Sequence, residues 1–124
     1  MSPTHIRGPL CPGCSAKLEL ACEKLQEWFY TVKRIYPDIH ISCGYRGKEE
    51  QEKAFRSGSS KLHYPDSKHN QNPAEALDLF QLDSAGKGIF DPVAMARIFN
   101  EFGNKMRWGG AFRSLGDGCH FELV

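Results

Sequence analysis

The order of hydrophobic patterns along the chain restricts its fold more than any other feature. Apolar residues recur at three- and four-residue steps from Ser15 onwards, which predicts a long amphipathic helix that Pro37 ends. Residues 39–43 then alternate between apolar and polar side chains, as a half-buried strand does. Further along the chain, the hydrophobic pattern changes again from the period of a helix to that of a strand. We therefore expect an α+β fold, with a small antiparallel sheet packed against helices.

The later segments carry clear boundary signals. Acidic residues open the next helical segment and a basic residue lies near its end, the order that the helix dipole favours. An aspartate followed by proline is a strong start for the helix after it. The predicted elements are a helix over 48–57, a strand over 76–82, a helix from Asp91-Pro92 to Gly103, and extended segments over 107–110 and 119–124.

Chain length and net charge limit the number of domains and the kind of partner. A chain of 124 residues with 40% hydrophobic residues fits one domain with a modest core. We expect an irregular arm over residues 1–14 and a single domain over residues 15–124, and we expect a monomer. The net charge of +1 gives no basic surface for nucleic acid.

The amino-terminal residues lack a targeting signal. Residues 1–10 are polar and broken by proline and glycine, so they do not resemble a signal peptide. No later run approaches the ~18 apolar residues of a membrane span. We therefore expect a protein made in the cytoplasm, with no stable membrane insertion.

Five cysteines is an odd number, which suits free thiols better than a disulfide framework. Cys11 and Cys14 form a Cys-x-x-Cys, which is half of a structural zinc site, and only Cys22 or His5 lies near enough in sequence to complete it. An ordinary turn with two thiols is the alternative. A thioredoxin-like role requires a preceding strand, which the sequence does not predict.

Histidines and carboxylates at two places along the chain supply the donors of a metal site. His69 lies on a loop, Asp78 on the strand that follows, and His120 on the last extended segment, where Glu122 shares its face. Catalytic zinc takes three such ligands and keeps one position open. Asp117 lies in a glycine-flanked turn, from which its carboxylate could act as a general base. By spacing alone, the more usual interpretation is of ordinary surface or core histidines and a turn-forming aspartate.

At this point the sequence resembles the zinc D,D- and L,D-peptidases of peptidoglycan, which include D-Ala-D-Ala carboxypeptidases and phage L-alanyl-D-glutamate endopeptidases. The resemblance covers about residues 25 to 124, with the motifs in the same order. These are Ser42-x-Gly44-Tyr45-Arg46, Gln51, Ser60-Lys61, Ser67-Lys68-His69-Asn70-x-x-Pro73-x-x-Ala76-x-Asp78-Leu79, Trp108-Gly109-Gly110 and Asp117-x-x-His120-Phe121-Glu122.

The resemblance implies a single Hedgehog-like zinc peptidase domain and a role for each matched residue. It implies Zn²⁺ as the cofactor, bound by His69, Asp78 and His120. Asp117 would be the catalytic base and Arg46 would stabilise the oxyanion. The remaining matched residues would contact substrate or support the cleft, with core packing as an alternative for the tryptophan: Ser67, Gln51, Tyr45 and Trp108.

The implied function is hydrolysis of a peptidoglycan stem peptide, as in a phage endolysin that causes host lysis by cell wall degradation. The alternatives are a D-Ala-D-Ala carboxypeptidase or dipeptidase, and an inactive zinc-containing binding module. The segment between His69 and Asp78 is two residues longer than in the commoner family pattern, which leaves the substrate open. Without a signal peptide, a lytic enzyme would need help to reach the wall.

Overall fold

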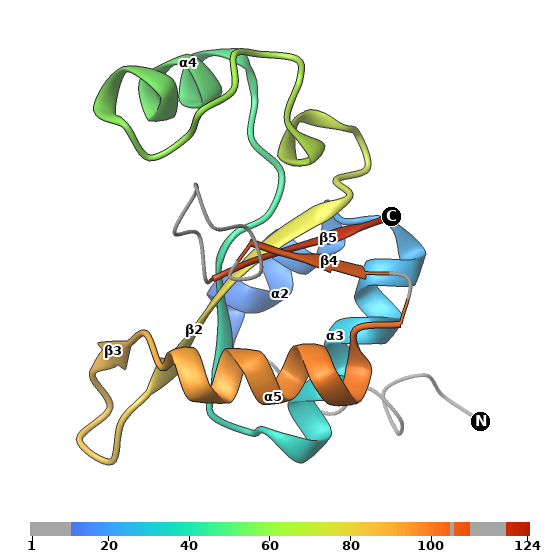
Figure 1. Cartoon of the computed structure of the whole chain (residues 1–124), viewed down its shortest axis with the longest axis vertical. Helices are drawn as coiled ribbons and strands as arrows, with labels where there is room; N and C mark the ends of the chain where they lie inside the picture. The colour runs from blue at the N-terminus through green and yellow to red at the C-terminus, as the bar shows by residue number, and fades with distance from the viewer. Residues whose placement is uncertain (1–10, 105, 110–118) are drawn as a thin grey trace.

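The computed structural model describes residues 11–104, 106–109 and 119–124. These residues form an α+β domain in which α-helices pack around a small antiparallel sheet (Figure 1). The elements are α2 (Pro12–Glu19), α3 (Glu23–Ile35), β1 (Ile39–Cys43), α4 (Lys48–Ser57), the 3₁₀ helix η1 (Lys68–Asn70), β2 (Ala76–Leu82), β3 (Gly88–Ile89), α5 (Pro92–Phe102), β4 (Met106–Trp108) and β5 (His120–Leu123). The predicted fold class is confirmed.

The sheet has the order β1-β2-β5-β4, and the short strand β3 pairs with β2 at the far end of that strand. All of the named pairings are antiparallel. The long strand β2 is central, because it pairs with β1 on one side and with β5 on the other. Segments far apart in sequence therefore meet on β2.

The two faces of the sheet differ in chemistry. Leu77, Leu79 and Phe121 are fully or almost fully buried and pack with residues of α2, α3 and α5. Because side chains alternate along a strand, Asp78 and His120 lie on the opposite face. In Figure 1, α4 lies apart from the other helices, beyond the end of the strands. One face thus holds the core, while the other is free to carry polar groups.

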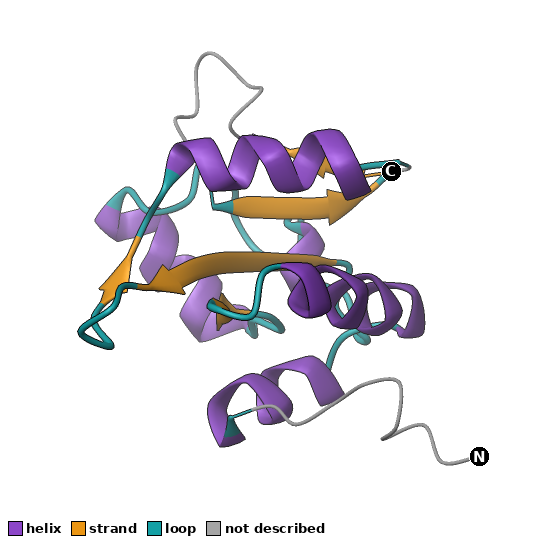
Figure 2. Cartoon of the chain, turned by 90° about the horizontal axis from the view of Figure 1, so that it is seen from below, coloured by secondary structure: helices purple, strands orange, loops and turns teal. Residues whose placement is uncertain are grey.

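The amino-terminal helix differs from its prediction in two ways. Helix α2 begins at Pro12, inside the segment expected to be irregular, and Figure 2 shows it directly after the grey amino-terminal trace. The single helix expected from Ser15 is divided into α2 and α3. The division occurs where Ala74 donates to the carbonyl of Leu20 and accepts from the backbone N–H of Cys22, both at 2.9 Å. A tertiary backbone pairing therefore interrupts the helical pattern.

The other helix boundaries follow local chemistry. Gly58, which follows α4, has φ +83°, a left-handed conformation that closes a helix with little strain only in glycine. Asp91 caps α5 by accepting hydrogen bonds from the backbone of Val93 and Ala94. These boundaries match the sequence predictions. Among the described residues, no helix combines the length and the apolar character needed to cross a membrane.

Candidate metal centre

Three side chains from separate elements converge on the polar face of the sheet. Nε2 of His69 lies 3.2 Å from Oδ1 of Asp78 and 3.2 Å from Nδ1 of His120. Nδ1 of His120 lies 3.0 Å from the same oxygen of Asp78. His69 is 2% exposed and His120 is 9% exposed. The three predicted ligands are thus brought together at the edge of the buried interior.

Strand register and a capped 3₁₀ helix produce this convergence. Asp78 and His120 are direct partners in the β2–β5 pairing, so their side chains project side by side. His69 reaches them from η1, where Oγ of Ser67 accepts a hydrogen bond from the His69 backbone N–H at 3.1 Å. Oδ1 of Asn70 in turn accepts from the Ser67 backbone N–H at 3.0 Å. This capping box fixes the loop that carries His69.

The second nitrogen of each imidazole ring has its own partner. Nδ1 of His69 lies 2.6 Å from the carbonyl oxygen of Gly44, which can only accept a hydrogen bond. Nε2 of His120 lies 2.7 Å from Oε1 of Glu122. Each of these nitrogens therefore donates. In the neutral form of each ring, the lone pair then lies on Nε2 of His69 and on Nδ1 of His120, the two atoms that face Asp78. Such outer partners orient the histidine ligands of metal sites.

The electrostatics of the centre favour a positive charge between the three groups. Burial alone disfavours the charged ring, but the hydrogen bond and charge of Asp78 raise the pKa of His69 to about 10. The pKa of His120 is raised to about 9 in spite of burial, through Asp78 and Glu122. Burial opposes ionisation of Asp78, but the two histidines hold its pKa well below the usual range. Protons or a metal ion can supply the charge that these groups attract.

The donor set and its spacing fit zinc. Ligands at about 2.0–2.2 Å from a tetrahedral zinc ion lie roughly 3.3–3.5 Å apart, close to the separations of these three atoms. Cys43 also lies near His69 and Asp78. Its sulfur, however, is 3.9 Å from Nδ1 of His69, the nitrogen that bonds to Gly44. We therefore favour His120 over Cys43 as the third ligand.

Arg46 lies beside the three groups and is held in place by a buried amide. Its Nη1 donates to Oε1 of Gln51 at 3.0 Å, and its Nη2 lies 3.7 Å from Oδ2 of Asp78. Gln51 is fully buried, and its amide nitrogen donates to the carbonyl of Leu62 at 2.7 Å. Asn70 donates both to Gln51 and to the backbone carbonyl of Arg46. The guanidinium is thus fixed near the candidate metal position by a connected network.

The remaining predicted site residues have different positions. Trp108 stacks against Phe121 and packs at the edge of the core. This position agrees with core packing, the alternative to a role in the cleft. Tyr45 is half-buried and precedes Arg46 in the loop after β1. Asp117, the predicted base, lies outside the described residues.

The roles of two further residues in this centre could not be derived from the sequence. Gly44 acts through its carbonyl oxygen, which no side-chain pattern reports. Cys43 accepts a hydrogen bond from Nη2 of Arg46 at 3.3 Å, although the alternation of β1 indicated only a strand residue. The sequence did contain a signal for Glu122, because it lies two residues after His120 and therefore on the same face.

The chain matches no protein-family model, and a search of curated proteins finds no significant match. Among solved structures, it is similar to the L-Ala D-Glu endopeptidase ChiX of Serratia marcescens, with a TM-score of 0.73 and 24% sequence identity. The similarity covers 93% of this chain and 89% of that one. At this identity, the match establishes a shared fold.

Proposed function

We propose that the protein is a zinc-dependent peptidase that hydrolyses the bond between L-alanine and D-glutamate in peptidoglycan stem peptides. The convergence of His69, Asp78 and His120 within 3.2 Å of one another carries the proposal. The shared fold with an L-Ala D-Glu endopeptidase over most of both chains supports the choice of bond. The motifs that resemble peptidoglycan peptidases support the same substrate class.

His69, Asp78 and His120 would hold the zinc ion. When bound at such a site, zinc supplies Lewis-acid chemistry, because it polarises a carbonyl group and lowers the pKa of water. Gly44 and Glu122 keep the two histidine rings in the tautomers that present a lone pair to the ion.

Arg46 supplies a fixed positive charge beside the three ligands. As water attacks the peptide carbonyl, the carbonyl oxygen gains negative charge, and a preorganised guanidinium stabilises that charge more than the neutral substrate. Gln51 acts as a positioning residue, because its buried amide holds Arg46 in one orientation. Asp117 would accept the proton of the attacking water and return it to the leaving amine as the C–N bond breaks.

Digestion of purified sacculi tests the proposed function. The zinc-loaded wild type should release peptides that begin with D-glutamate and leave L-alanine on the glycan, as read by mass spectrometry. His69→Ala and Asp117→Asn should lose this activity, whereas the matched surface variant Asp38→Asn should retain it. Asp117→Asn should still bind zinc, which separates loss of the base from loss of the metal.

The alternatives give different products in the same experiment. Release of free D-alanine would indicate a carboxypeptidase acting on D-Ala-D-Ala ends. If the wild type binds zinc but releases no product, the chain is a zinc-containing binding module. We also propose that the protein comes from a phage and takes part in host lysis. Its expression in a bacterial host should then lyse the cells, provided that the protein is given a route across the inner membrane to the cell wall.

A further inference from the structure

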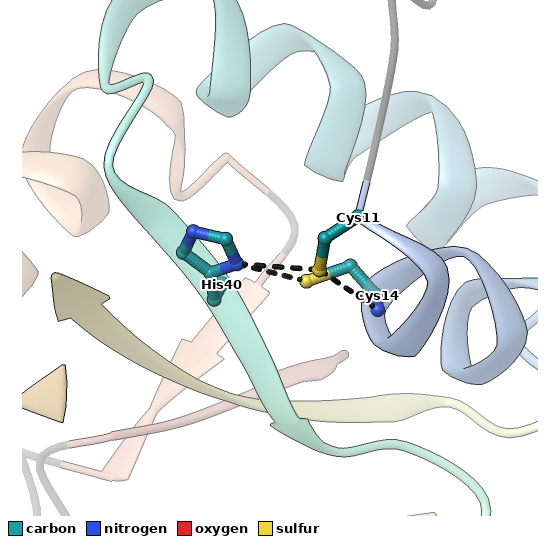
Figure 3. A group of neighbouring side chains, drawn as sticks. All are labelled: Cys11, Cys14 and His40. Carbon is teal, nitrogen blue, oxygen red and sulfur yellow. Dashed lines mark hydrogen bonds between the residues drawn. The ribbon is translucent and has the colours of Figure 1, made fainter. Parts of the chain in front are cut away.

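We propose that Cys11, Cys14 and His40 form a second zinc site, which joins the start of α2 to β1. The site is separate from the candidate metal centre and does not rest on the proposed function. Its three potential ligand atoms all lie within 4.8 Å of one another. Figure 3 shows both sulfur atoms facing the same nitrogen of His40.

The distances match the requirements of a tetrahedral metal site. Nδ1 of His40 lies 3.3 Å from Sγ of Cys14 and 3.5 Å from Sγ of Cys11. Zinc binds sulfur at about 2.3 Å and imidazole nitrogen at about 2.0–2.1 Å, so tetrahedral geometry separates these atoms by roughly 3.6 Å. All of the cysteines are free thiols in this structure. Two thiolates and one imidazole form a donor set that zinc favours.

Backbone hydrogen bonds support both sulfur atoms. The backbone N–H of Cys14 donates to Sγ of Cys11 at 3.4 Å, as expected when a cysteine caps a helix. The backbone N–H of Ile41 donates to Sγ of Cys14 at 3.3 Å. Such N–H groups stabilise negative charge on sulfur, the form that binds metal. The first turn of α2 and the strand β1 therefore supply an outer shell as well as the ligands.

The third ligand corrects two expectations from the sequence. The alternation predicted over residues 39–43 assigns His40 to the polar face of the strand, but its side chain is half-buried and stacks on Phe80 with ring centroids 5.5 Å apart. Cys22, one of the two residues expected to complete a local site, is not in this group, and the other, His5, lies outside the described residues. The ligand that completes the group is 26 residues beyond Cys14, and only the fold brings it there.

The position of the site indicates a structural role. The strand β1 ends at Cys43, and the next residue, Gly44, orients His69 through its carbonyl. A metal ion that joins α2 to β1 would therefore stabilise the strand that leads to the candidate metal centre. Because a structural zinc ion almost always has four ligands, a fourth donor would have to complete the tetrahedron beside these three.

Cobalt substitution under reducing conditions tests the site, because thiolate ligands give cobalt(II) a sulfur-to-metal charge-transfer band in the near ultraviolet. We expect this band in the wild type and its loss in Cys11→Ser. Cys11 is exposed, so its replacement should leave folding intact. Cys22→Ser is the matched control, and it should keep the band.

Zinc content gives an independent measurement that does not depend on the first centre. In the His69→Ala background, the protein should retain about one zinc ion per chain, and the added Cys11→Ser change should remove it. The thermal midpoint of the zinc-loaded protein should fall with that loss. Unchanged zinc content in Cys11→Ser, or a Cys11–Cys14 disulfide in the reduced preparation, would overturn the proposal.

Discussion

Glu122 offers a sharp test of how the candidate centre is built, because it does not face the metal position directly. It accepts a hydrogen bond from Nε2 of His120 at 2.7 Å, and its side chain is only 15% exposed. A hydrogen bond to a charged group contributes about 1.5–3 kcal/mol. Removing the carboxylate in Glu122→Ala should therefore weaken zinc binding by about 10- to 100-fold. Glu122→Gln keeps an acceptor without the charge and should lose only a few-fold.

Zinc affinity is measured by competition with a chromophoric chelator, in a Cys11→Ser background so that only one centre contributes. Glu101→Gln is the matched control, because Glu101 pairs with Tyr36 at 2.6 Å on the surface of the domain. Its affinity should equal that of the background. If Glu122→Ala binds zinc as tightly as the background, the orienting role assigned to this carboxylate is incorrect.

Further predictions concern the amide network, pH and the core. Gln51→Leu should lower kcat/KM while zinc content stays unchanged, because Arg46 loses its orientation. The same change leaves buried polar groups unpaired, and each of them should lower the free energy of unfolding in urea by about 1–3 kcal/mol. Since the pKa values of His69 and His120 lie near 10 and 9 without metal, protonation stabilises the metal-free fold below about pH 6.5 and is lost as the pH rises through those values. The rise in thermal midpoint on adding zinc should therefore increase from about pH 6 to about pH 8, and a constant rise would contradict this. Phe29→Ala should destabilise the fold by about 3–5 kcal/mol in urea unfolding, because Phe29 is fully buried; a cost of under about 1 kcal/mol would contradict its place in the core.

Local sequence patterns predicted those parts of the fold that local chemistry determines. The bounds of β2 and α4 follow alternation, end charges and a terminal glycine, all of which act over a few residues. The break between α2 and α3 could not be predicted, because the backbone of Ala74 causes it from more than fifty residues away. A helical pattern does not contain that information.

The same distinction applies to the two metal-binding groups. The pairing of Asp78 with His120 was predictable, since both lie on strands and the family resemblance gave their order. The placement of His40 opposite Cys11 and Cys14 was not predictable, because alternation within β1 assigns it to a face without showing what packs there. Site residues that act through the backbone, such as Gly44, are likewise visible only in the folded chain.

We propose that His69, Asp78 and His120 bind one metal ion together. Anomalous diffraction at the zinc edge from crystals of the zinc-loaded protein measures this directly. We expect a peak about 2.0–2.2 Å from Nε2 of His69, an oxygen of Asp78 and Nδ1 of His120. A well-ordered site without a peak, or a peak bound through Cys43 instead of His120, would contradict it.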